Sequence, residues 1–304
     1  MKITHLPYKK ILVIGCNGFI GSHLYSYFRN KNIEVIGADI NSLNNQTFLL
    51  NKDLSNLKDL LNLYSFDLCI NASGSATVSY SIQNEKDDFL LNYKNVEKIL
   101  DAFKIYQANC KFINLSSAAV YGNPASLPIN ENAITNPISP YGKHKLLSEE
   151  LLLNRAKSDG LATLSLRIFS VYGNGLKKQL FWDIYQKTLI SDVLYLYGTG
   201  LETRDFIHIE DLMLALEKII LHAHFDGSAI NVASGMESTI NLAAHTLIKH
   251  LKPNTAIKFS GLQNSADPNY WKADISKLKG MGFIPEISLE EGLKKYAQWL
   301  KELN

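Results

Sequence analysis

The chain has 304 residues, more than the roughly 100 to 200 of an average domain, which favours a large domain joined to a smaller lobe. Its 31 lysines and arginines nearly balance 29 aspartates and glutamates, so neither nucleic acid nor an anionic membrane is expected as the main partner. The first apolar run, residues 11–14, is too short for a signal sequence or a membrane span, and we expect a soluble, cytoplasmic protein.

The cysteines and histidines give no metal-binding pattern. Cys16, Cys69 and Cys110 lie far apart, and we interpret them as buried, reduced thiols. His222 and His224 have no carboxylate partner nearby in sequence, so we interpret them as surface residues and expect no metal.

In chain order, short apolar runs alternate with longer helical patterns. The expected strands are residues 10–15, 33–38, 68–72, 111–116 and 163–168, and the expected helices include residues 18–31, 86–105 and 140–157. Continuous apolar runs between helices are typical of a parallel sheet that is covered on both faces. The sequence therefore predicts an α/β fold with a doubly wound parallel sheet, the Rossmann arrangement.

A smaller C-terminal substrate-binding lobe is expected after this sheet. Loops surround residues 172–175, and a helix at 180–190 and a strand at 193–197 follow them. Helix 211–221 and strand 229–233 are expected to return to the main sheet. We therefore assign residues 1–172 and 206–233 to the large domain and residues 173–205 and 234–304 to the small lobe.

A glycine-rich loop joins the first expected strand to the first helix. Gly15 permits a tight turn, Gly18 lets a diphosphate approach the backbone, and Gly21 lets the helix pack closely on the sheet. The diphosphate would meet free amides at the positive end of the helix dipole. Asp39 follows at the end of the second strand, where a carboxylate binds the ribose hydroxyls and repels a 2′-phosphate. These residues predict NAD rather than NADP as cofactor.

A second group of polar residues lies where the ligand crevice of such a sheet is expected. The strand at 111–116 ends in Ser116 and Ser117, and Tyr141 and Lys145 share one face of the following helix. A lysine ammonium stabilises a phenolate, and we expect it to lower the pKa of Tyr141. Tyr141 would then exchange a proton with a substrate hydroxyl while hydride moves to the nicotinamide.

With these motifs the chain resembles the extended short-chain dehydrogenase/reductase family, and within it the NAD-dependent nucleotide-sugar epimerase/dehydratase group that includes UDP-glucose 4-epimerase. The resemblance implies that Ser117 binds the reacting oxygen, Tyr141 is the acid/base and Lys145 also holds the nicotinamide ribose. It implies a wider set of cofactor-binding residues, namely Gly15, Asn17, Gly18, Phe19, Ile20, Gly21, Asp39, Asp53, Leu54, Asn71, Ala72, Ser73, Asn92, Tyr141, Lys145 and Phe169. It also implies substrate contacts from Ser116, Ser117, Ser170 and Arg204.

Three departures from the family pattern narrow the chemistry. Ala118 and Ala119 stand where the dehydratases and decarboxylases of the family carry acidic residues, so water elimination and decarboxylation are disfavoured. Ser170 stands where the family often has Asn, and residues 263–268 lack the arginine that contacts the substrate diphosphate. Arg204 remains the best partner for a nucleotide diphosphate. Lys177 and Lys178 are either additional charges for it or solvated surface lysines.

Three functions are compatible with this pattern. The first is a nucleotide-sugar epimerase that oxidises a hydroxyl to a ketone and returns the hydride to the other face. The second is an NAD(P)H-dependent reductase of a 4-keto-6-deoxy nucleotide sugar, and the third is a non-catalytic, NAD-binding regulatory protein, which the intact Ser117, Tyr141 and Lys145 set argues against. The family resemblance also implies a homodimer that pairs helices 86–105 and 140–157 through apolar residues such as Leu91, Val96, Leu100, Leu147 and Leu151. Phe181, Trp182 and Tyr185 either line the small-lobe pocket or pack within the lobe.

Overall fold

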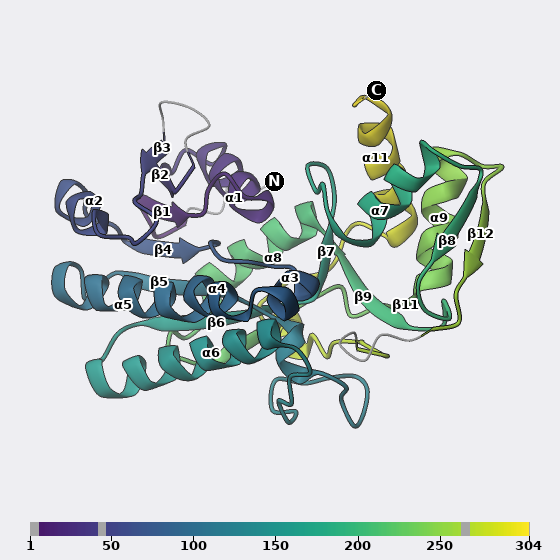
Figure 1. The fold of residues 1–304 in the computed structure, drawn as a ribbon. Coiled ribbons are helices and arrows are strands. Elements are labelled where there is room, and N and C mark those ends of the chain that lie inside the picture. The colour runs from purple at the N-terminus through teal and green to yellow at the C-terminus, as the bar shows by residue number, and fades with distance from the viewer. Residues whose placement is uncertain (1–5, 42–46, 263–267, 304) are drawn as a thin grey trace.

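The computed structural model describes residues 6–41, 47–262 and 268–303. Figure 1 shows a sheet with helices on both of its faces and, beside it, a smaller group of strands and helices.

A parallel sheet forms the centre of the larger part. Within the described residues it contains seven strands in the order β10-β6-β5-β4-β1-β2-β3, and each neighbouring pair is parallel. The strands are β1 (Lys10–Ile14), β2 (Glu34–Asp39), β3 (Thr47–Leu49), β4 (Leu68–Asn71), β5 (Lys111–Ser117), β6 (Thr163–Ile168) and β10 (Ala229–Val232). The order reverses beside β1, and this confirms the predicted doubly wound fold.

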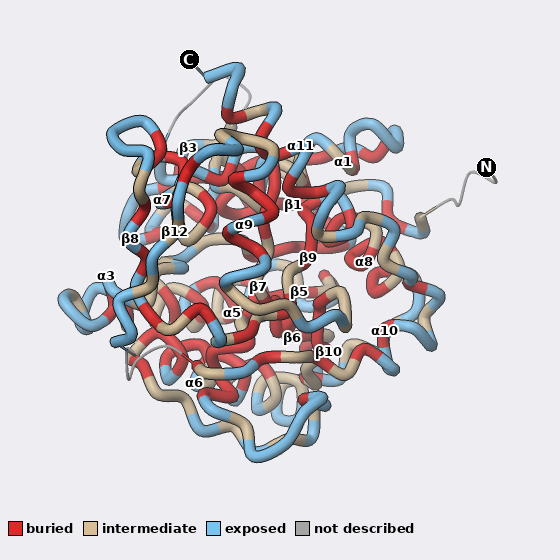
Figure 2. Tube along the Cα trace, turned by 90° about the vertical axis from the view of Figure 1, so that its right-hand side faces the viewer, coloured by how far each residue is buried: buried red, intermediate tan, exposed pale blue. Residues whose placement is uncertain are grey.

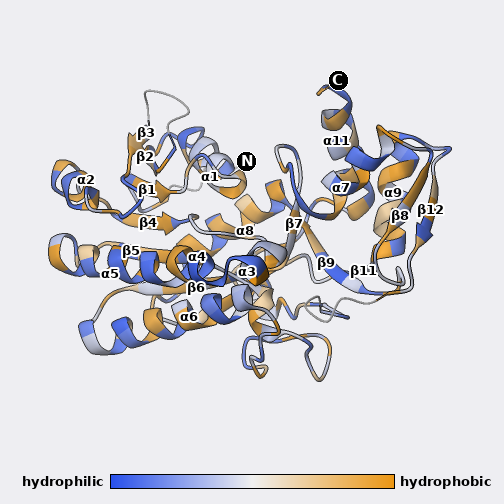
Figure 3. Ribbon diagram, viewed as in Figure 1, coloured by the Kyte–Doolittle hydropathy of each residue, from blue (hydrophilic) through white to orange (hydrophobic). Residues whose placement is uncertain are grey.

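The two faces of β1 enter two different cores because successive strand side chains point in opposite directions. Ile11 and Val13 pack in the cluster that includes α1 (Phe19–Arg29) and α8 (Ile209–His222). Leu12 and Ile14 pack in the cluster that includes α2 (Leu57–Leu63), α5 (Asn95–Tyr106) and α6 (Pro140–Asp159). Figures 2 and 3 show the result, with buried and hydrophobic residues concentrated on the sheet and on the inner helix faces. Two shorter helices are α3 (Val78–Gln83) and α10 (Ser276–Gly280), and α10 packs against α8 and β10 although it comes from the segment assigned to the small lobe.

The expected helix at 86–105 is interrupted by a wider turn. The structure has α4 (Glu85–Phe89), a π-helical turn (Leu90–Lys94) and then α5. This turn carries Asn92, which is buried at 1% exposure. Wide turns of this kind insert one extra residue into a helix and are frequent at functional sites. The apolar periodicity alone did not indicate the interruption.

The smaller lobe is built around an aromatic core. Its strands are β7 (Ser170–Tyr172), β8 (Val193–Leu196), β9 (Thr203–His208), β11 (Glu237–Thr239) and β12 (Ala256–Phe259), and its helices are α7 (Gln179–Thr188), α9 (Ile240–Leu251) and α11 (Leu289–Lys301). Tyr172, Phe181, Tyr185 and Tyr296 are buried in one cluster. Phe181 also lines the cleft described below, so this ring both packs within the lobe and lines the pocket, the two alternatives left open by the sequence.

Several predictions on chain organisation can be compared with this structure. The helix expected at 211–221 and the strand expected at 229–233 are α8 and β10, and β10 pairs with β6 of the main sheet. The domain boundaries themselves stay a prediction. The three cysteines are buried and unpaired. In the described part of the chain, no helix is both long and apolar enough to cross a membrane.

Candidate active site

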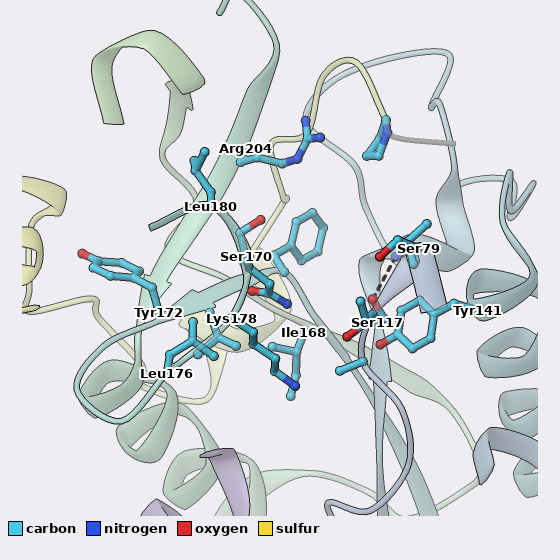
Figure 4. Close-up of a pocket in the computed structure, with 18 of the residues that line it drawn as sticks. Ser79, Ser117, Tyr141, Ile168, Ser170, Tyr172, Leu176, Lys178, Leu180 and Arg204 are labelled. Carbon is cyan, nitrogen blue, oxygen red and sulfur yellow. Dashed lines mark hydrogen bonds between the residues drawn. The ribbon is translucent and has the colours of Figure 1, made fainter. Parts of the chain in front are cut away.

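A cleft of about 690 Å³ lies where β4, β5 and β6 end, between the main sheet and the smaller lobe. Figure 4 shows Ser117 and Tyr141 on one side of it, with Leu176, Lys178 and Leu180 on the other. The carboxyl ends of parallel strands form the usual ligand crevice of this fold. The predicted site residues that line the cleft are Ile20, Ala72, Ser73, Ser116, Ser117, Tyr141, Lys145, Phe169, Ser170 and Arg204.

The glycine-rich loop has the conformation that the motif predicts. Gly15 has a φ of +81°, which residues with a side chain rarely adopt. A Cβ added to Gly21 would lie 2.0 Å from the carbonyl oxygen of Gly15, so only glycine lets α1 approach the loop this closely. The amides of Phe19 and Ile20 open the helix, where backbone donors have no acceptor within the helix. Such donors suit a phosphate.

Asp39 ends β2 beside this loop and is only 8% exposed. Its two carboxylate oxygens each accept one backbone hydrogen bond of 3.0 Å, from the amides of Asn17 and Asn41. A carboxylate can accept up to about four hydrogen bonds, so this group retains capacity for ribose hydroxyls. Asp39 is therefore held in place before any ligand binds.

The other predicted cofactor residues divide into a buried group and an exposed one. Asn71 donates a 2.8 Å hydrogen bond to Asn114, and its own oxygen accepts from Ser73, which fixes the loop after β4. Asn92 is buried, and its Oδ1 atom has no hydrogen-bond partner. Asp53 is exposed, and hydrogen bonds from Ser55 lower its pKa. Ser73 lines the cleft, whereas Asn71, Asn92, Asp53 and the loop glycines do not.

Tight packing brings the acid/base candidates together. A Cβ on Gly142 would lie 2.5 Å from the carbonyl oxygen of Ala119, so α6 begins in contact with the turn that follows β5. Tyr141 is 7% exposed and Lys145 is 5% exposed. The Ser117 hydroxyl accepts a 3.1 Å hydrogen bond from the amide of Ala119. All three side chains face the cleft.

The electrostatics of this group differ from the sequence expectation. Burial raises the pKa of Tyr141 to about 12, while a hydrogen bond with Ser117 lowers it and the charge of Asp88 raises it. Burial lowers the pKa of Lys145 to about 8, opposed by Asp88 and Glu149. The expected lowering of the Tyr141 pKa by Lys145 was wrong for this structure. The ammonium lies 5.9 Å from the ring centroid and donates a 2.8 Å hydrogen bond to the carbonyl of Leu115, so burial dominates.

The predicted substrate residues have different surroundings. Both serines line the cleft, but the Ser116 hydroxyl is engaged as a donor to buried Glu149, and Ser170 lies on the cleft side (Figure 4). Arg204 donates to the carbonyl of Thr203 and lies over the ring of Trp271 at 5.5 Å. Residues 263–267, the segment that lacks the expected arginine, lie outside the described residues.

The structure separates the two adjacent lysines that the sequence left undecided. Leu176 and Lys178 both line the cleft, while Lys177 does not. Residues 176–178 thus alternate in direction, as an extended segment does. Lys178 remains accessible to solvent, yet desolvation in the cleft lowers its pKa. This residue is therefore a cation available to an anionic ligand.

Sequence reasoning missed two buried charge clusters next to the site. Arg167 of β6 pairs with Glu149 at 2.7 Å and donates a 2.8 Å hydrogen bond to the hydroxyl of Tyr121. His144 of α6 pairs with Asp88 of α4. The signal for the second cluster was present in the sequence, because His144 lies between Tyr141 and Lys145. Its partner is distant in sequence and could not be identified from spacing.

Comparison with known proteins identifies the family. The pattern of the NAD-dependent epimerase/dehydratase family matches residues 11–233. This chain belongs to that family. The membership confirms the predicted family, the predicted enzyme class and NAD as the cofactor.

Relatives match over nearly the whole chain. A Bacillus subtilis protein named as an uncharacterized UDP-glucose epimerase is 29% identical over 97% of this chain and 98% of its own length. The UDP-glucuronic acid 4-epimerase of Bacillus cereus, solved with UDP-glucuronic acid and NAD, is 28% identical with a TM-score of 0.88, covering 97% of this chain and 100% of that one. The UDP-N-acetylglucosamine 4-epimerase of Methanobrevibacter ruminantium, solved with UDP-N-acetylmuramic acid, is 26% identical with a TM-score of 0.87, covering 97% and 99%.

The residues present fit NAD. The first turn of α1 would offer amides to the diphosphate and Asp39 would offer acceptors to a ribose, and the buried Oδ1 atom of Asn92, which has no partner, would accept a further hydrogen bond. Among the described residues, no group of three or more His, Cys, Asp or Glu side chains is placed to hold a metal ion.

Proposed function

We propose that this protein is a nucleotide-sugar epimerase that inverts a carbon of the sugar through a transient ketone. Bound NAD supplies the acceptor and the donor of the hydride. In the first step the sugar C–H bond gives up a hydride and its hydroxyl gives up a proton. Both return in the second step, with the hydride delivered to the opposite face. The reaction therefore needs no external oxidant or reductant.

We assign the proton to the Tyr141 hydroxyl because it is the cleft-lining phenol next to Ser117. Ser117 would donate a hydrogen bond to the reacting oxygen. Lys145 would stabilise the Tyr141 phenolate and contact the nicotinamide ribose. A phenol whose pKa is about 12 requires a positive charge nearby to release its proton near neutral pH, and we assign this charge to Lys145, whose ammonium lies 5.9 Å from the Tyr141 ring centroid.

The substrate is proposed to be a nucleoside diphosphate sugar. Arg204 and Lys178 are cations on the cleft wall, and a diphosphate is the anionic group that distinguishes this substrate class from free sugars. The two solved relatives described above bind UDP-sugars, which makes UDP-sugars the first compounds to test. Ala118 and Ala119 carry no ionisable atom, which favours epimerisation over water elimination.

The observation that carries this proposal is the convergence of Ser117, Tyr141 and Lys145 at the cleft of an NAD-dependent family member. The test begins with a panel of UDP-, dTDP-, GDP- and CDP-sugars, with product stereochemistry read by NMR. Single-turnover hydride transfer and NAD affinity are then measured for Tyr141→Phe, Ser117→Ala and Lys145→Ala.

Each variant has its own expected result. Tyr141→Phe should abolish turnover with NAD affinity nearly unchanged, because the ring remains and only the hydroxyl is lost. Ser117→Ala should reduce the rate by about 10² to 10³, the loss typical of one donor to a developing oxyanion. Lys145→Ala should impair both turnover and NAD retention. Hydride transfer by Tyr141→Phe at the wild-type rate would refute the mechanism, and net consumption of NADH or NADPH would favour the keto-sugar reductase. Binding of NAD without any turnover would favour a regulatory protein.

A homodimer and a cytoplasmic location remain part of the proposal. Val96 and Leu100, expected at the dimer interface, are instead buried in the chain's own core. Leu91 and Leu151 are half-buried, and Leu147 is exposed. Exposed apolar residues on the same helices, Leu90 and Ile105, could supply the remaining contact area. Light scattering at micromolar concentration tests the proposed homodimer, and a monomeric mass would contradict it.

A further inference from the structure

Two buried polar residues meet beside the helix that carries the acid/base candidates. Asp88 lies in α4 and is 0% exposed, and His144 lies in α6 between Tyr141 and Lys145 and is 6% exposed. The Nδ1 atom of His144 is 2.6 Å from the Oδ2 atom of Asp88. Burying a carboxylate is costly unless it is paired, and removing one partner of such a pair is usually strongly destabilising. The Asp88–His144 pair therefore has either a structural role alone or a role in the neighbouring site as well.

The second oxygen of Asp88 determines how Asn92 is oriented. The Nδ2 atom of Asn92 donates a 2.9 Å hydrogen bond to the Oδ1 atom of Asp88. An ionised carboxylate only accepts hydrogen bonds, so Asn92 must present its NH₂ group to Asp88 and its oxygen away from it.

The oxygen of Asn92 faces the loop that lines the cleft. A Cβ on Gly74 would lie 2.5 Å from the Oδ1 atom of Asn92, so the two are in close contact. Gly74 lies in the cleft wall after β4, and the Asn92 oxygen is buried without a donor. A buried acceptor at this position suits a hydroxyl or amide that a dinucleotide brings with it.

A second contact joins α6 to the π-helical turn that follows α4, and it involves no ionisable group. The Ser148 hydroxyl of α6 donates to the backbone carbonyl of Asn92 in the π-helical turn. Helix α6 is thus attached twice to the segment from α4 to α5, once through the hydrogen bond between His144 and Asp88 of α4 and once through the Ser148 hydroxyl and the π-helical turn. Ser148 therefore provides a control for the loss of a helix contact.

Asp88 also acts on the acid/base pair through its charge. The Asp88 carboxylate raises the pKa of Tyr141 and opposes the lowering of the Lys145 pKa. The ionisable groups around this pair are Asp88 from α4, His144 and Glu149 from α6, Arg167 from β6 and Lys178 across the cleft. Glu149 is paired with Arg167, which leaves Asp88 as the carboxylate that acts on both members of the pair.

We propose that Asp88, held by His144, is a positioning residue that orients Asn92 toward the cofactor and sets the charge environment of Tyr141 and Lys145. The proposal rests on the function proposed above, because one of its readouts is the pH dependence of hydride transfer. The other readout is cofactor affinity, which does not require turnover.

The test compares Asp88→Asn with two control variants. Asp88→Asn keeps the size of the side chain but removes the charge and lets the Asn92 amide turn over. His144→Asn keeps a donor where Nδ1 lies, and Ser148→Ala removes the neutral contact. Single-turnover hydride transfer is measured from pH 6 to pH 10, and NADH affinity is measured by fluorescence titration of the same proteins.

Two results are expected for Asp88→Asn. NADH should bind about tenfold more weakly, the size of effect that one misdirected buried hydrogen bond produces. In the plot of hydride-transfer rate against pH, the alkaline limb should move to lower pH. Loss of the Asp88 charge makes the Tyr141–Lys145 pair easier to deprotonate. In His144→Asn and Ser148→Ala, the alkaline limb of the pH–rate profile should lie at the same pH as in the wild type.

Other outcomes would overturn the proposal. An Asp88→Asn variant that loses rate equally at all pH values and retains wild-type NADH affinity would show a purely structural role, as would an equal shift in Ser148→Ala. If Asp88→Asn does not fold, the double variant Asp88→Leu/His144→Leu removes both polar partners and is measured in the same way. A wild type without hydride transfer would refute the proposed function, and the NADH titration would still test the orientation of Asn92.

Discussion

Asp39 allows a quantitative prediction of cofactor preference. Its carboxylate is fixed by the amides of Asn17 and Asn41 and is largely buried, so it cannot easily move away from a ligand. NADP carries a phosphate in place of the ribose 2′-hydroxyl that Asp39 would bind. Two unit charges about 5 Å apart repel by about 3 kcal/mol at an effective dielectric constant of 20. That energy corresponds to roughly 10²-fold in affinity.

The wild type should therefore bind NADH about 10²-fold more tightly than NADPH. Asp39→Asn removes the charge and keeps one acceptor oxygen, so the ratio should fall to within about tenfold while NADH affinity changes less. Nicotinamide fluorescence titration measures both affinities, with Asp59→Asn as a control because Asp59 is exposed and lies outside the predicted cofactor-binding set. Equal affinity for NADH and NADPH in the wild type would refute this reasoning and favour the reductase. An unchanged ratio in Asp39→Asn would show that another residue selects the cofactor.

Three further predictions follow from single contacts. Lys178→Met should raise the KM for the nucleotide sugar about tenfold, as the loss of a charged hydrogen bond does, and Lys177→Met should not, which steady-state kinetics can check. Gly21→Ala should abolish NAD binding and lower the Tm, because its Cβ would lie 2.0 Å from a backbone oxygen, whereas Gly280→Ala has no atom within 4 Å and serves as the control in calorimetry and NADH titration. Burial lowers the pKa of His208 to about 4, so the unfolded chain binds its proton more readily, and the free energy of unfolding should fall by up to about 3 kcal/mol between pH 6.5 and pH 4. Urea unfolding at several pH values should show a shallower slope for His208→Asn than for the wild type, and equal slopes would exclude this group.

The main sheet could be predicted because its strands are buried on both faces. Strands such as β1 and β4 are short, continuous apolar runs, and each is followed by turn residues, so pattern and structure coincide. The small lobe was predicted only in part. Its strands β7 and β9 mix polar with apolar residues, β11 is entirely polar, and the three pair across long sequence separations. Local periodicity carries no information about such pairing.

The candidate site was predictable where its residues follow strand ends and unpredictable where they depend on distant contacts. Ser117, Tyr141 and Lys145 were found from position and spacing, because the topology of a parallel sheet places strand ends together. The direction of the Tyr141 pKa shift was not predicted correctly, because burial outweighs the effect of the neighbouring lysine. The partner of His144 is 56 residues away in sequence, beyond the reach of any local pattern.

The reaction class follows from which cleft residues can move a proton. Two carboxylates line the cleft in the described part of the chain, and both are engaged elsewhere: Glu202 accepts hydrogen bonds from the amides of Thr199 and Gly200, and Asp183 pairs with Lys187. Water elimination from a sugar needs an acid and a base at two different positions, whereas hydride exchange at one carbon needs a single proton carrier. Tyr141, the proton carrier proposed above, would meet the second requirement alone. The arrangement of charges in the cleft therefore favours oxidation and re-reduction of one hydroxyl over dehydration, for the same reason that Ala118 and Ala119 do.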